Sequence, residues 1–186
     1  MSLRSAMGVA IALCCLSPRP VAAGSGELPT SLRASLVWRV LAYDRRNSPA
    51  PHPLALVAAA EGPGAGWARE AAAALETAGS SGAVPLPIVS PGEGLQERLC
   101  ALRVHAVLLA PGLAAERAEI LRATRACDVL SFATTEEEVV AGVAIGLVAR
   151  DGRPKVLVNL EAARAEGATL DAGLLRLAQL VKGVAQ

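Results

Sequence analysis

Two cysteines in the body of the chain, Cys100 and Cys127, are the side chains best suited by type and number to form a covalent link. The sequence has four cysteines, and the other two, Cys14 and Cys15, stand in an apolar N-terminal segment. Removing that segment leaves an even pair, which favours a disulfide in an oxidising compartment. Such a bridge would close a loop of about 28 residues and add roughly 3–4 kcal/mol by the chain-entropy treatment. The alternative is a pair of buried free thiols.

The two histidines offer little for metal binding or catalysis. His52 lies in a proline-rich loop, and His105 stands near the start of an apolar run. Neither has zinc-ligand spacing relative to Cys100 or Cys127, so we expect no metal. A histidine could activate Cys100 as a nucleophile, but the disulfide competes for the same sulfur. The sequence also lacks a G-x-S-x-G elbow. We therefore expect no enzyme, no catalytic residue and no cofactor.

A glycine-rich segment at residues 61–66 (EGPGAG) stands between an apolar run and a helical pattern. A phosphate-binding loop would occupy this place, at the N-terminus of a helix. The spacing is not G-x-G-x-x-G, however, and no G-K-[ST] follows. We interpret the segment as a tight turn that needs glycine.

The composition fits one small domain that does not bind nucleic acid. The chain has 186 residues, of which 53% are hydrophobic and only 2% aromatic. A core of alanine, leucine and valine is typical of helices packed on a sheet. The net charge of the full chain is +1, with no basic patch or charge run. Nucleic acid is therefore excluded as the expected partner.

The N-terminus has the organisation of a secretory signal peptide. Arg4 supplies a positive charge, and residues 6–16 form an apolar run that is too short to span a bilayer. Small residues then precede an expected cleavage site after Ala23. A lipoprotein that uses Cys14 or Cys15, or a buried N-terminal helix, is the alternative. We predict a signal peptide at residues 1–23, a polar linker at 24–29, one domain at 30–186 and a periplasmic location.

Apolar spacing in the domain predicts alternating strands and helices. Helical stripes begin near residues 30, 67, 95 and 113, and short apolar runs occupy 54–60, 84–89, 104–110 and 129–133. Thr30 or Ser31 is expected to cap the first helix. Pro85 and Pro87 place the second strand at a sheet edge. The glutamates at 136–138 are expected to start a solvated helix. This alternation predicts a parallel sheet with helices on both faces.

The last third of the chain departs from that rhythm. Apolar residues alternate on both sides of residues 150–153 (RDGR), which predicts a β-hairpin with an Asp-Gly turn. Leucines and small apolar residues between Leu170 and Val181 then predict a closing amphipathic helix. The expected fold is an α/β domain of three layers, with a mostly parallel sheet and a C-terminal antiparallel hairpin.

From residue 139 onward the sequence resembles the YfiR family of bacterial periplasmic proteins. The resemblance rests on residues 141–145 (AGVAI), 155–160 (KVLVNL), 162–167 (AARAEG) and 174–178 (LLRLA), in an order and spacing that agree over about 45 residues. The residues that match the family motif are Gly142, Asn159, Ala163, Leu174, Leu175 and Ala178. We expect them to be structural, with Asn159 capping a short Ala-rich helix and the leucines in a core or a dimer surface.

The resemblance implies a regulator. YfiR-like proteins bind the periplasmic sensor domain of an inner-membrane diguanylate cyclase, hold it inactive, and so lower cyclic-di-GMP and biofilm formation. It also implies an inner-membrane signalling protein as partner. A homodimer is an open expectation. Trp38 and Trp67 are candidate interface residues, because tryptophan often dominates binding energy. Redox stress could act through Cys100 and Cys127. The alternative function is a small periplasmic solute-binding component, with a ligand at the carboxyl ends of the strands.

Overall fold

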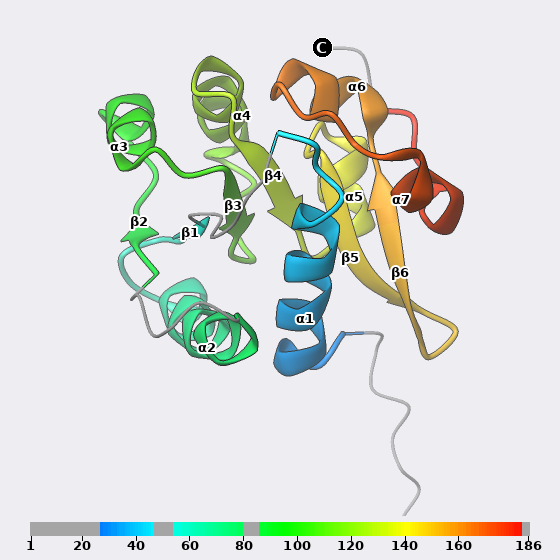
Figure 1. Ribbon diagram of the computed structural model, residues 1–186. Coiled ribbons are helices and arrows are strands. Elements are labelled where there is room, and N and C mark those ends of the chain that lie inside the picture. Colours follow the sequence, from blue (N-terminus) through cyan, green and yellow to red (C-terminus); the bar gives the residue numbers. More distant parts are fainter. Residues whose placement is uncertain (1–26, 47–53, 80–85, 184–186) are drawn as a thin grey trace, which may run out of the picture.

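The computed structural model describes residues 27–46, 54–79 and 86–183. They form one seven-stranded sheet with helices packed around it (Figure 1). The strand order is β2-β1-β3-β4-β5-β6-β7. All pairs are parallel except β5 with β6. The predicted fold class, a mostly parallel α/β sheet with an antiparallel hairpin, is therefore confirmed.

The central strands are buried on both faces, as their continuous apolar runs predict. They are β1 (Leu54–Val57), β3 (Ala106–Leu109) and β4 (Leu130–Ala133), and every residue in them is buried. Helices that cover both faces of a parallel sheet produce this pattern. The edge strand β2 (Ile88–Val89) is shorter than predicted, and Ile88 is exposed. Its edge position is confirmed.

The helices of the parallel part form two layers. The chain provides α1 (Thr30–Leu41), α2 (Pro63–Ala78), α3 (Leu95–Leu102), α4 (Arg117–Ala126) and α5 (Glu136–Val140). Helix α1 packs against α2, and α3 packs against α4. Because crossovers between parallel strands are right-handed, α2 lies on one face and α3, α4 and α5 on the other. The glutamates at 136–138 begin α5 as expected, and the Thr135 hydroxyl accepts from the Glu138 amide at its start.

The predicted hairpin is confirmed in β5 (Ile145–Arg150) and β6 (Arg153–Val158). Asp151 and Gly152 both have positive φ, 52° and 69°. A two-residue turn with two positive φ angles matches the twist of the paired strands, and Asp-Gly is a favoured sequence for it. The turn lies at the lower right in Figure 1, at the carboxyl end of β5.

The predicted closing helix is wrong in its length and its end. The chain forms α6 (Leu160–Ala165), then a short α7 (Ala172–Leu177), and then the strand β7 (Gln179–Leu180), which adds to β6 in parallel. Ala178 turns to extended backbone with ψ at 154°, and the Val181 amide donates to the Val158 carbonyl. Pairing with an open sheet edge thus overrides the helical spacing of the leucines.

The expected cap of α1 is also wrong. The residue before the helix is Pro29, and no side chain caps the amides of the first turn. The Thr30 hydroxyl instead donates to Glu70 Oε1 of α2 at 2.7 Å. Thr30 therefore joins two helices rather than capping one.

The signal peptide at 1–23 and the first half of the linker at 24–29 lie outside the described residues, so both remain predictions. The domain boundary at residue 30 likewise remains a prediction. Within the described ranges, no helix is both long and apolar enough to cross a bilayer.

Candidate functional site

The two cysteines singled out by the sequence meet in a disulfide. The Cys100–Cys127 bridge has its Cα atoms 5.2 Å apart and joins the end of α3 to the residue after α4. Cys100 is exposed and Cys127 is half-buried. The bridge therefore lies where solvent and reductants can reach it.

Both tryptophans are half-buried against the core. The indole Nε1 of Trp38 on α1 donates to the Leu75 carbonyl of α2 at 2.9 Å, so this side chain joins the two helices. Trp67 lies in the second turn of α2 beneath the guanidinium of Arg33. Neither ring is freely exposed, and the place of either in an interface stays a prediction.

The residues of the family motif support local structure. Asn159 Oδ1 accepts from the Ala162 amide and caps α6, and its amide nitrogen donates to the Val139 carbonyl. Gly142 has φ at 112°, which only glycine adopts readily. Ala163 and Leu174 are buried, whereas Leu175 and Ala178 are half-buried.

Among the described residues, the side chains and the glycine-rich segment considered for metal or phosphate binding do not come together in a binding site. Among the described residues, no group of three or more His, Cys, Asp or Glu side chains could hold a metal. His105 is exposed before β3, and His52 lies outside the described residues. In the glycine-rich segment, a Cβ on Gly64 would lie 3.3 Å from the Pro111 carbonyl oxygen. The start of α2 therefore packs directly on the loop after β3, where a phosphate would have to enter.

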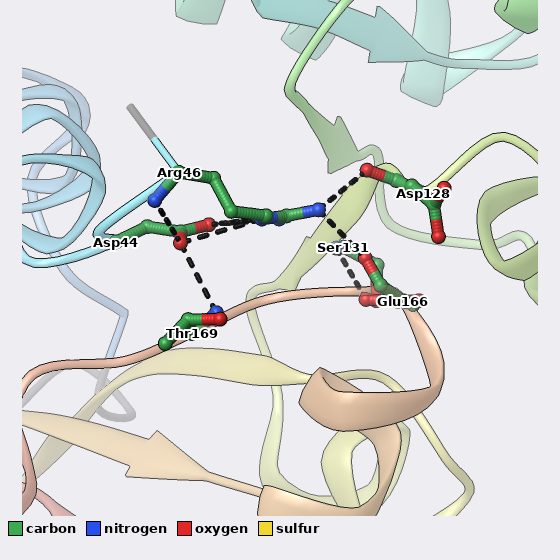
Figure 2. Close-up of polar contacts among 6 residues, drawn as sticks. All are labelled: Asp44, Arg46, Asp128, Ser131, Glu166 and Thr169. Carbon is green, nitrogen blue, oxygen red and sulfur yellow. Dashed lines mark hydrogen bonds and ion pairs between the residues drawn. The ribbon is translucent and has the colours of Figure 1, made fainter. Parts of the chain in front are cut away.

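A buried ion pair anchors the segment after α1 to the C-terminal part of the chain (Figure 2). The Asp44 side chain is fully buried and pairs with Arg46 at 2.7 Å, and Asp44 Oδ1 also accepts from the Thr169 amide. Arg46 Nη1 donates further to the carbonyls of Asp128 and Glu166. Burial would raise the pKa of Asp44, but the hydrogen bonds from Arg46 and from the amides outweigh it and hold the pKa below its ordinary value.

Next to this pair lies a second buried carboxyl group, that of Glu166, which has no counter-ion within hydrogen-bond distance in the part of the chain that the structure describes. Its oxygens accept from the Thr124 hydroxyl at 2.8 Å, the Ser131 amide at 2.8 Å and the Ser131 hydroxyl at 2.7 Å. Burial raises the pKa of Glu166 to about 7, and the hydrogen bonds from Ser131 and Thr124 oppose the shift only in part. Glu166 therefore changes charge in the neutral pH range.

The neighbouring hydroxyls can accommodate a protonated Glu166. Thr124 Oγ1 lies 2.8 Å from Glu166 Oε1 and 3.1 Å from the Leu121 carbonyl, and its single proton serves one acceptor at a time. A proton on the carboxyl group can be donated to Thr124, which then donates to Leu121. The Ser131 hydroxyl also accepts from the Ala144 amide, so this network joins α4, β4 and the start of β5.

A third buried charge is Arg33 on α1, which is 1% exposed. Its guanidinium carbon lies 5.5 Å from the centre of the Trp67 ring, and Nη2 contacts Glu27 Oε1 at 3.5 Å. Burial lowers the pKa of Arg33, and the carboxylates of Glu27 and Glu70 oppose that shift. Arg33 follows the spacing of the buried α1 residues Val37 and Val40, which is the one sequence signal that it faces inward.

The carboxyl ends of β3, β4 and β5 border a hollow of about 530 Å³. This edge is where ligands bind in open α/β sheets. The hollow is lined by Glu27, Pro111, Thr134, Thr135, Glu136, Glu137, Val148, Ala149 and Arg150. Arg150 and Glu136 form an ion pair across it.

Exposed apolar side chains gather at the two edges of the sheet. On the β7 edge, Leu177 is 78% exposed and Leu180 is 54% exposed. On the β2 edge, Ile88 and Leu102 are 43% and 40% exposed and border a hollow of about 760 Å³. The β7 edge thus presents the more exposed leucines.

Comparison with solved structures shows the fold. This chain is similar to the ABC domain in complex with L-Trp from Streptococcus pneumoniae, with a TM-score of 0.54 over 80% of this chain. It is also similar to a conserved domain protein from Vibrio cholerae O1 biovar El Tor str. N16961, with a TM-score of 0.59 over 83% of this chain. Each is 13% identical, and the match spans 60% of each of those longer chains.

Comparison by sequence is more specific. A search of curated proteins found no match. The family described as YfiR/HmsC-like matches residues 31–179, which include strands β1 to β6 and the first residue of β7.

Proposed function

We propose a function from the family to which this chain belongs, the YfiR/HmsC-like family. The chain holds the periplasmic sensor domain of an inner-membrane diguanylate cyclase inactive and so lowers cyclic-di-GMP. At the level of the family, the chain is a periplasmic regulator that acts with a membrane signalling protein. The match over residues 31–179 is the observation that supports the proposal. Regulation requires only that the chain bind one state of the cyclase better than the other. It needs no catalytic step.

The β7 edge is the surface that best fits such a partner. On its outer side, β7 has no paired strand among the described residues, so its backbone groups are available for strand addition. Leu180 on β7 and Leu177 just before it present apolar side chains beside that edge. We assign this edge, defined by residues 177–180, to the cyclase sensor domain.

Capture of the partner tests this assignment. The chain with Leu177→Asp and Leu180→Asp is expected to recover about tenfold less diguanylate cyclase from solubilised inner membrane than the unaltered chain, because charge at an apolar hot spot is not tolerated. The captured proteins are identified and quantified by mass spectrometry. Both leucines are exposed, so the variant is expected to fold normally.

The opposite sheet edge provides a matched control. Ile88→Asp with Leu102→Asp changes two apolar residues on the β2 edge, which are also exposed. We expect this variant to capture the cyclase as well as the unaltered chain does. Equal capture by the β7 variant, or loss of capture by the β2 variant instead, would place the interface elsewhere.

A further inference from the structure

Three buried nitrogen atoms between α1 and α2 have no acceptor in the described ranges of the chain. Among the described residues, Arg33 Nε, Arg33 Nη1 and Trp67 Nε1 are buried and make no hydrogen bond. Buried polar groups in proteins are almost always paired, so three in one place need an explanation. All three are donors, and two belong to a cation. What they lack is an acceptor, preferably one with negative charge.

The carboxylate of Glu27 contacts Arg33 Nη2, which is not one of these three nitrogens. Its Oε1 lies 3.5 Å from Arg33 Nη2, which is a long contact, and its side chain is 68% exposed. Nη2 lies between the two other nitrogens of the guanidinium group. A carboxylate that replaced Glu27 could therefore pair with Nη2 and with either Nη1 or Nε, in the two-point geometry that carboxylates and guanidinium groups favour.

The position of Glu27 connects Arg33 to the hollow at the carboxyl ends of the strands. Glu27 lines that hollow on one side and contacts Arg33 on the other. It lies before α1, outside any helix or strand, so its side chain can move without disturbing an element. The Trp67 ring supports the guanidinium from a helix and keeps it in place.

We propose that Arg33 and Trp67 form a binding site for the carboxylate of a small solute, whose remainder lies in the hollow of about 530 Å³ and whose carboxylate displaces Glu27. The Thr134 side chain, which also lines the hollow, can contact the body of the solute. This site does not depend on the proposed partner, and it would be present in a chain that regulates something else.

The two tryptophans allow a direct measurement. The chain has only Trp38 and Trp67, so nitrogen-15 NMR of residues 24–186 shows two indole signals. On titration with succinate at constant ionic strength, we expect a saturable shift of the Trp67 indole signal. The Trp38 indole already donates to Leu75, so its signal is expected to stay in place and serves as an internal reference. The neutral analogue succinamide is expected to shift neither signal.

Variants separate this site from general anion effects. Glu27→Gln removes the competing carboxylate, and we expect it to bind succinate about three to ten times more tightly. Arg33→Gln is expected to abolish the shift, whereas Arg39→Gln, an exposed arginine on the same helix, is expected to leave it unchanged. The proposal is overturned if neither the unaltered chain nor Glu27→Gln shows a saturable Trp67 shift. It is also overturned if phosphate binds as tightly as succinate. Because Glu27 is exposed, that variant gives an answer even if Arg33→Gln does not fold.

Discussion

Replacing both Cys100 and Cys127 by serine is expected to lower the free energy of unfolding by about 3–4 kcal/mol, through the entropy of the unfolded chain. The bridge links residues 27 apart in sequence and joins α3 to the residue after α4. Without it, the unfolded chain gains freedom that the bridge removes. Urea denaturation of the oxidised chain and of the double variant measures the difference.

Reduction provides the control for this experiment. Dithiothreitol is expected to destabilise the unaltered chain by the same amount and to leave the double variant unchanged, because the variant has no bridge to reduce. If the double variant is as stable as the oxidised chain, the bridge has no structural role. If it also captures the partner normally, the hypothesis that redox stress acts through this bridge is wrong.

The second large effect concerns pH and the buried carboxyl group of Glu166. Its pKa is raised to about 7 in the folded chain, from an ordinary value near 4.5. The folded state therefore holds a proton that the unfolded state releases, so stability falls as pH rises from about 4.5 to 7. The full loss is about 3 kcal/mol and is present above pH 7. Urea denaturation at pH 5 and at pH 8 measures most of this loss.

Glu166→Gln isolates the contribution of this group. Glutamine carries no charge at either pH, so we expect the variant to lose most of the difference in stability between pH 5 and pH 8. At pH 8 it is expected to be at least as stable as the unaltered chain. Glu161→Gln, an exposed position in α6, is the matched control and should keep the original pH dependence. A Glu166→Gln chain with the original pH dependence would contradict the account of the buried carboxyl group.

The pH range of this experiment lies above the range in which the other buried carboxylate, that of Asp44, changes charge. Asp44 has a lowered pKa, so its contribution is present above the ordinary aspartate value and is lost only as pH falls through the folded value. That loss occurs below pH 4. The two buried carboxyl groups therefore act in separate pH ranges, although both lie in one cluster around Arg46 (Figure 2).

The sequence predicted strands β1 to β6 and most helices because their signals are local. Continuous apolar runs marked β1, β3 and β4, and the Asp151-Gly152 pair marked the hairpin. The end of the chain was mispredicted because its structure depends on a distant partner. Leu177 and Leu180 have helical spacing with their neighbours, but the unpaired edge of β6 draws residues 179–180 into the sheet. Nothing in the local sequence indicates that residues 179–180 join the sheet instead of continuing a helix.

The buried charges were missed for a related reason. Glu166 stands in the family motif at 162–167, but nothing in its neighbours distinguishes a buried glutamate from a solvated one. Its burial results from Thr124 and Ser131, which are 42 and 35 residues away in sequence. Asp44 and Arg46 follow α1 in a segment with no local pattern that indicates a buried ion pair, and their partners lie at residues 169 and 128. Only Arg33 had a usable signal, its spacing with Val37 and Val40.

The most direct test of the proposed regulation is the cyclic-di-GMP content of cells that lack this chain. We expect the content to rise when the gene is deleted and to return to the original level when the full sequence is supplied. We expect no return when residues 24–186 are supplied without the predicted signal peptide, because the sensor domain lies outside the cytoplasm. An unchanged cyclic-di-GMP content in the deletion strain, or restoration by the form without a signal peptide, would contradict a periplasmic inhibitor of a diguanylate cyclase.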